Sequence, residues 1–231
     1  MSTERKIAYV YSDEFIHYCN QLPKVKQRAS LVHSLIEAYG LLNLNNISIV
    51  QPEAATFKEL AKFHSKDYIT CLQKADDCDE HDVEESLEEF GIGYDCPAFE
   101  DFYKCLTMVA GGTLKAVECL DNKSHSIAIN WCGGWHHAHR VVKEVNSYFQ
   151  PDAIVCQCGV DGLAGDPMNS FNLTQYGLGA SVHYISSLEK PLLLLGGGGY
   201  NFPNAARCWT YITAMVLGKK LPEDIPDHEV Q

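Results

Sequence analysis

Short apolar runs alternate along the chain with longer segments in which apolar residues recur every three to four positions. The short runs are rich in Val and Ile and contain few polar residues, which is typical of strands buried on both faces of a sheet. We expect strands over residues 7–11, 47–50, 126–130, 153–158 and 192–195.

The intervening segments predict amphipathic helices. One apolar stripe consists of Leu31, Val32, Leu35, Ile36 and Tyr39. A second consists of Phe102, Leu106, Val109, Leu114 and Val117, and we expect Gly111-Gly112 to break it. A third helix is expected over residues 205–217, ending at Gly218. Repeated strand–helix alternation predicts an α/β fold with a parallel sheet covered by helices on both faces.

The chain has 231 residues, of which 46% are apolar, so one domain over residues 1–231 is expected. No apolar stretch reaches the roughly 18–20 residues that span a bilayer. We therefore expect a soluble, intracellular protein without a membrane partner. The ten cysteines are scattered along the chain, several of them within apolar runs (Cys105, Cys119, Cys156 and Cys208), and form no C-x-x-C pair, which favours reduced thiols over disulfides or a zinc knuckle.

The net charge is −12, but nine acidic residues and no Lys or Arg lie within residues 76–90. The remaining balance is 18 − 21, or −3, so the charge is concentrated in one segment. This acidic segment is interpreted as a solvated loop or as a rim that attracts basic peptides. No basic patch is visible, so direct binding of nucleic acid is not expected.

Three of the expected strands are followed by unusual residues, and ligands of parallel α/β sheets bind at the carboxyl ends of strands. The first carries His136-His137 after Gly133-Gly134. Neutral His suits general base chemistry near pH 7, although two adjacent loop histidines also occur without any catalytic role.

The second strand end carries Asp161 within the sequence GVDG. A carboxylate there is a competent zinc ligand, while an Asx turn or a helix N-cap is the alternative. Asp166, which precedes Pro167, is interpreted as a turn or cap of that kind.

The third strand end carries four glycines, residues 196–199, followed by Tyr200. No Lys follows in the pattern of a phosphate-binding loop. Tyr200 is therefore the chemical group of this loop, and its hydroxyl could donate to a developing oxyanion. In a separate Gly-rich turn, GIGYDCP, Asp95 is either an ordinary turn residue or a group that grips a peptide backbone.

Six segments resemble a known family: QRASLVHSLIEAYGLL, GIGYDCPAFE, AINWCGGWHHA, AGDPMNSFN, LLLLGGGGYNFPNAARCWTY and IPDHE. They resemble the class I zinc-dependent histone deacetylases of the arginase–deacetylase superfamily, nearly end to end. The resemblance implies that fold, Zn²⁺ as cofactor, and acetylated histone tails and other acetyl-lysine proteins as substrates and partners. It also implies residence in nucleus and cytoplasm. The arginase-like and acetylpolyamine hydrolases share the fold but are disfavoured by the segments GYDCP and GGGGYN.

The resemblance also implies individual roles. His137 is expected to be the general base beside a second, electrostatic His136, with Asp161 as a zinc ligand and Tyr200 as the oxyanion donor. Four residues are expected at the substrate, namely Asp95, Met168, Gly134 and Gly199. Arg28 is expected in an internal channel, and Ser30 matches a phosphorylation site.

One block of the family pattern is missing. The family supplies two further zinc ligands from a D-x-H strand end in the middle of the domain, and no such strand end is present in this chain. The join lies near residues 139–141. Asp161 remains as the one implied ligand, which is too few for a catalytic zinc site. His139 is a weak substitute because its supporting partners would also have to be rebuilt. The chain is therefore interpreted as a lysine deacetylase of doubtful activity, or alternatively as an inactive isoform or incomplete gene product that binds peptides or partners.

Overall fold

The computed structural model describes residues 5–76, 87, 90, 92, 97–134, 149–168 and 171–228. Its centre is a five-stranded sheet in the order β2-β1-β3-β5-β4. The strands are β1 (Ile7–Val10), β2 (Ile47–Val50), β3 (Ile127–Asn130), β4 (Ile154–Gln157) and β5 (Leu192–Leu195). Every neighbouring pair is parallel. The predicted α/β class and all five strands are confirmed, with ends shifted by one residue at most.

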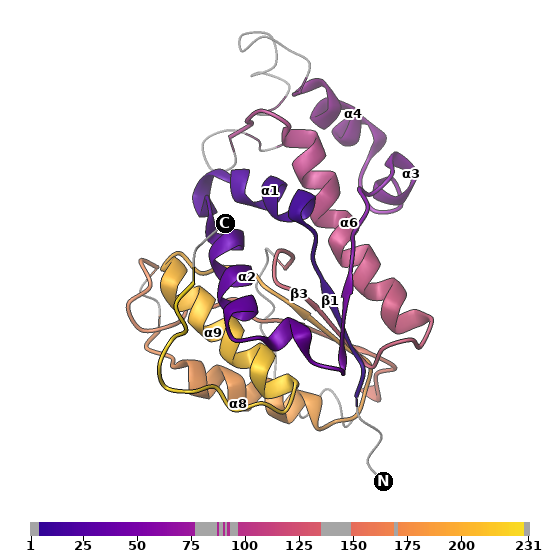
Figure 1. Cartoon of the computed structure of the whole chain (residues 1–231). Helices are drawn as coiled ribbons and strands as arrows, with labels where there is room; N and C mark the ends of the chain where they lie inside the picture. Colours follow the sequence, from indigo (N-terminus) through magenta and orange to yellow (C-terminus); the bar gives the residue numbers. More distant parts are fainter. Residues whose placement is uncertain are drawn as a thin grey trace.

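Helices cover both faces of this sheet (Figure 1). The longer helices are α1 (Asp13–Gln21), α2 (Arg28–Ala38), α4 (Lys66–Lys74), α6 (Phe102–Asp121), α8 (Gln175–Ser186) and α9 (Phe202–Val216). The short ones are η1 (Pro23–Val25), η2 (Leu41–Asn43) and α3 (Phe57–Leu60). Helices α2, α8 and α9 pack on one another on one face, whereas α1 packs against α6 on the other.

The strand side chains divide between two cores because successive residues point to opposite faces. Ile127 and Ile129 of β3 join the core under α2, α8 and α9. Ala128, between them, joins the core under α1 and α6. The continuous apolar runs therefore serve two cores, as predicted for the central strands.

Burial on both faces was wrong for the two edge strands. Ile49 of β2 is 49% exposed and Val155 of β4 is 65% exposed. Val155 lies in register with Leu193 of β5, which is buried. The helices that cover β5 on that face therefore do not extend over β4.

The expected break at Gly111-Gly112 was also wrong, because α6 runs unbroken through both residues. A Cβ at Gly111 would overlap the backbone oxygen of Glu53, and one at Gly112 would lie 2.7 Å from the Phe15 ring. The two glycines thus allow close packing on the face of an intact helix. Gly218 acts as predicted: α9 ends at Val216, and Gly218 follows with φ +70°.

The eight cysteines that the structure describes carry reduced thiols, which agrees with the expectation of no disulfide framework. Within the described ranges, no helix is long and apolar enough to cross a membrane.

Candidate functional site

The strand order places the three predicted loops side by side. Because β5 lies between β3 and β4, the loop after β5 contacts the loops that follow both neighbours. The amide of Gly196 donates to the Asn130 carbonyl at 3.1 Å, and the amide of Val160 donates to the Gly198 carbonyl at 2.8 Å. The three loops therefore form one interlocked edge of the sheet, as their positions at carboxyl ends predict.

The glycines of the β5 loop are required by close packing. A Cβ at Gly196 would overlap the Trp131 carbonyl oxygen. A Cβ at Gly198 would lie 2.5 Å from the carboxyl carbon of Asp161. The Asp161 carboxylate thus lies directly against the backbone of the β5 loop, which brings two of the predicted loops into contact at a candidate residue.

Tyr200 is held through its backbone by Asp166. One carboxylate oxygen of Asp166 accepts hydrogen bonds from the amides of Tyr200 at 2.7 Å and Asn201 at 3.0 Å. The other oxygen accepts from the Met168 amide at 3.0 Å, which is the turn predicted for Asp166. Asp166 is only 4% exposed. Its turn role was predicted, but its bridge to the Tyr200 loop was not.

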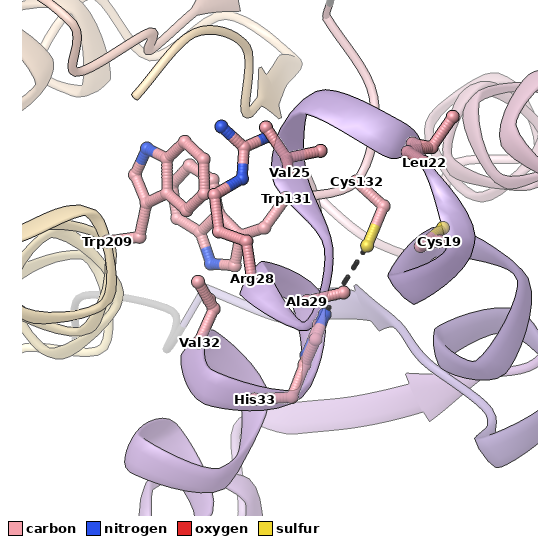
Figure 2. A pocket seen from close by; sticks show the side chains of 10 residues that line it. All are labelled: Cys19, Leu22, Val25, Arg28, Ala29, Val32, His33, Trp131, Cys132 and Trp209. Atoms are coloured by element: carbon pink, nitrogen blue, oxygen red, sulfur yellow. Dashed lines mark hydrogen bonds between the residues drawn. The ribbon is translucent and has the colours of Figure 1, made fainter. Parts of the chain in front are cut away.

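Arg28 lies beneath the loops, where its buried guanidinium donates to the Gly199 carbonyl at 2.8 Å. Burial lowers the pKa of Arg28 to about 10, against the opposing influence of Cys132, Tyr200, Cys19 and Asp161. The side chain therefore remains charged at neutral pH. It lines a small cavity of about 10 Å³ (Figure 2), and its place in an internal channel stays a prediction.

Two stacked tryptophans support Arg28 and the start of the loop that carries Asp161. Trp131 and Trp209 are stacked with centroids 5.6 Å apart, and Arg28 lies 5.0 Å above the Trp209 ring. The Trp209 indole donates to the Cys158 carbonyl at 2.8 Å, so α9 holds the start of the loop that carries Asp161. Figure 2 shows the stacked rings beside Arg28.

Three of the four predicted substrate residues, Met168, Gly134 and Gly199, lie within the described residues. Met168 is 56% exposed, so the described residues do not enclose it. The Gly134 carbonyl accepts a hydrogen bond from Gln157 at 2.8 Å. Gly133 and Gly134 border a separate cleft of about 220 Å³ beside α4 and α6. Gly199 contacts Arg28 as described above.

Three predicted site residues, His136, His137 and Asp95, lie outside the described residues, as do His139 and the join near 139–141. Ser30 is buried, and its hydroxyl accepts from the Asn20 side chain at 2.6 Å. Phosphorylation there stays a prediction, and it would require the α1–α2 connection to open.

The described residues do not by themselves fit a zinc ion. No three His, Cys, Asp or Glu side chains among them gather into a group that could hold a metal. A catalytic zinc site uses three protein ligands in tetrahedral geometry. Asp161 is the one described residue for which the sequence predicts a ligand role.

Sequence reasoning missed three supporting groups: Asp166 as a bridge, Gln157 as the anchor of Gly134, and the Cys19–Cys132 pair beneath Arg28. Each depends on a partner far away in the sequence. In the sequence, the one sign of the Asp166 bridge is that this Asp precedes a proline. The same pattern is typical of an ordinary turn.

Comparison with known proteins gives one consistent result. The family profile described as "Histone deacetylase domain" matches residues 22–142 and 139–216. Histone deacetylase 8 of Danio rerio is 34% identical over 328 residues, covering 99% of this chain and 86% of that protein. Histone deacetylase 8 of Xenopus tropicalis is 34% identical, covering 96% of this chain and 86% of the relative. Histone deacetylase 2 of Oryza sativa subsp. japonica is 27% identical, with coverage of 98% and 64%.

Proposed function

Because this chain belongs to the histone deacetylase family, we propose that it is a lysine deacetylase domain whose zinc centre is incomplete, so that it binds acetylated peptides without hydrolysing them efficiently. The family consists of amide hydrolases, and the chain is a class I member similar to histone deacetylase 8. Its helix-covered parallel sheet agrees with the arginase–deacetylase fold.

One observation carries the proposal. The three interlocked loops bring Asp161 and the Tyr200 loop to one sheet edge, above a buried cation, yet the described residues supply no further pair of metal ligands there. The letters D-x-H occur once, at residues 79–81, within the acidic segment and outside the described residues. They do not follow a strand of the described sheet, so we do not assign them to the centre.

Two comparisons support a missing internal block near 139–141. The family profile matches in two pieces that meet at residues 139–142. The match to the Danio protein extends over 328 residues although this chain has 231, so at least 97 positions lack a counterpart. Among the described strands β4 lies at the edge of the sheet, with Val155 exposed, and further strands could pair and further helices could cover the sheet there.

The expected chemical consequence follows from metal coordination. Mutating a residue that hydrogen-bonds to one metal ligand lowers metal affinity by about 10–100-fold. The absence of two ligands lowers it further. A metal held at a complete site of this kind would activate the attacking water. We infer no such step for this chain. The remaining residues orient the loops: Asp166 holds the Tyr200 backbone, and Arg28 holds Gly199.

Acetylated, basic peptides such as histone tails are the proposed ligands. The acidic segment at residues 76–90 complements their charge, and the family acts on acetylated lysine. Residence in nucleus and cytoplasm stays a prediction from the family.

The test is hydrolysis of an acetyl-lysine peptide by the purified chain with added zinc, beside Danio histone deacetylase 8 as reference. We expect kcat/KM to be lower by at least about 10³-fold, with the peptide still binding and the unacetylated peptide binding more weakly. A rate within tenfold of the reference that disappears in His137→Ala would contradict the proposal. Genomic sequence between the codons for residues 139 and 141 tests the missing block separately.

A further inference from the structure

Two buried thiols from distant parts of the chain meet beneath Arg28. Cys19 lies near the end of α1, and Cys132 lies two residues after β3. Their residues are 3% and 6% exposed. Both line the small cavity shown in Figure 2, together with Arg28 and His33. The two thiols face the same cavity, close enough to influence each other's pKa.

His33 gives Cys132 a second polar partner. The His33 Nε2 atom lies 3.6 Å from the Cys132 sulfur, and Nδ1 lies 2.7 Å from the Tyr9 hydroxyl. Burial raises the pKa of Tyr9 well above its ordinary value, so Tyr9 keeps its proton and can donate to Nδ1. The proton of a neutral His33 then lies on Nε2, facing the sulfur.

These contacts make the two thiols unequal. The interaction with Cys19, followed by the hydrogen bond from His33, lowers the pKa of Cys132 despite its burial. Burial and the proximity of Cys132 raise the pKa of Cys19. Cys132 is therefore the thiolate that attacks, and Cys19 is the thiol that remains protonated until it is needed.

We propose that Cys19 and Cys132 form a peroxide-reactive dithiol that closes to a disulfide beneath the candidate site. The Cys132 thiolate attacks one oxygen of hydrogen peroxide, the O–O bond breaks, and Cys132 sulfenic acid and hydroxide form. The hydroxide takes the Cys19 proton and becomes water. The Cys19 sulfur then displaces hydroxide from the Cys132 sulfur, and this hydroxide takes up the proton that Cys132 lost on ionising. Two thiols and one peroxide thus give one disulfide and two waters.

The cavity and the fold make this reaction specific. The cavity volume of about 10 Å³ is at the lower limit for a single water, so bulky oxidants are excluded from the two sulfurs. The disulfide links α1 to the loop that leads to Gly133 and Gly134. It also removes a thiolate from beside Arg28, whose positive charge that thiolate supports. Oxidation therefore ties down the loop that precedes the predicted histidine pair.

Peptide mapping after peroxide treatment tests the proposal on the native full chain. Trypsin cleavage after Lys6, Lys24, Lys123 and Arg140 places the two cysteines in separate peptides, residues 7–24 and 124–140. We expect one to a few equivalents of hydrogen peroxide to join these peptides, and dithiothreitol to separate them. In Cys19→Ala, we expect Cys132 to accumulate as sulfenic acid, which a 1,3-dione probe traps.

Other thiols of the chain provide matched controls. Cys208→Ala removes a buried thiol whose pKa burial raises to about 12, and it should leave the linkage unchanged. Cys105→Ala removes a thiol that lies near Cys19 but donates to the Tyr18 carbonyl at 3.2 Å. The Cys105→Ala variant should therefore still give the linked peptides 7–24 and 124–140 after peroxide treatment.

Three outcomes would overturn the proposal. The first is peroxide treatment that leaves Cys132 fully open to alkylation after denaturation. The second is a link from Cys19 to Cys105 in place of Cys132. The third is oxidation confined to Cys156 and Cys158, whose sulfurs lie 3.8 Å apart within a single tryptic peptide. Because the parent chain itself gives the answer, poor folding of a variant does not prevent a decision.

Discussion

Replacing Asp166 with Asn tests whether this buried carboxylate holds the Tyr200 loop in place. The carboxylate accepts three backbone hydrogen bonds, from the amides of Met168, Tyr200 and Asn201, at 2.7–3.0 Å. Asn keeps the shape but turns one oxygen into an NH₂ donor. In either orientation, at least one backbone N–H then faces another donor. The variant therefore separates the acceptor role from packing.

The loss can be estimated from the bonds. A hydrogen bond to a charged group contributes about 1.5–3 kcal/mol, so Asp166→Asn should lower the free energy of unfolding by at least about that amount. For a domain of this size, 1 kcal/mol shifts the Tm by about 2–4 °C. The expected decrease in Tm is thus about 3–12 °C.

Thermal unfolding followed by circular dichroism at pH 7 measures the effect. Asp152→Asn is the matched control because Asp152 is exposed, and its Tm should change by no more than about 2 °C. Equal Tm values for the parent chain and Asp166→Asn would refute the bridging role. Equal decreases in both variants would refute it as well, because they would reflect net charge alone.

Further predictions use the same unfolding assay. Gly111→Ala should lower stability by about 1–3 kcal/mol through overpacking, whereas Gly177→Ala, with no close neighbour, should be neutral or stabilising. Arg28→Lys should cost about 1–3 kcal/mol because Lys cannot both stack on the indole and reach the loop carbonyl, and exposed Arg207→Lys should change little. Burial and a nearby Lys lower the pKa of His125, so protonation favours the unfolded chain and stability falls as the pH drops below about 6.5. Between pH 7.5 and 5.5, the Tm of His125→Gln should therefore fall less than that of the parent, and an equal fall would contradict this reasoning.

The sheet was predictable because each strand is a short apolar run between amphipathic segments. The pattern did not reveal which strands lie at the edges, because composition does not show which helix covers a given strand. Val155 has the same residue type as its buried counterparts, yet it is 65% exposed. The Gly111-Gly112 pair was misread for a related reason. The two glycines leave room for the Glu53 backbone and the Phe15 ring, which are close in space and distant in sequence.

The site was partly predictable from topology. Loops after neighbouring parallel strands share one edge, so the contact of the Asp161 loop with the Gly196–199 loop could be anticipated. The supporting contacts could not. Asp166 reaches across 34 residues to the Tyr200 amide, and Arg28 reaches across 171 residues to the Gly199 carbonyl. Such pairs join segments that are distant in the sequence, and no local pattern records their contact.

We propose that this chain folds as a histone deacetylase domain without a complete zinc centre. Zinc content measured after dialysis of the chain against a slight excess of Zn²⁺ tests it most directly, with Danio histone deacetylase 8 treated in parallel. We expect close to one zinc per chain in the relative and far less than one in this protein, unchanged in Asp161→Ala. One tightly held zinc per chain, lost in Asp161→Ala, would contradict it.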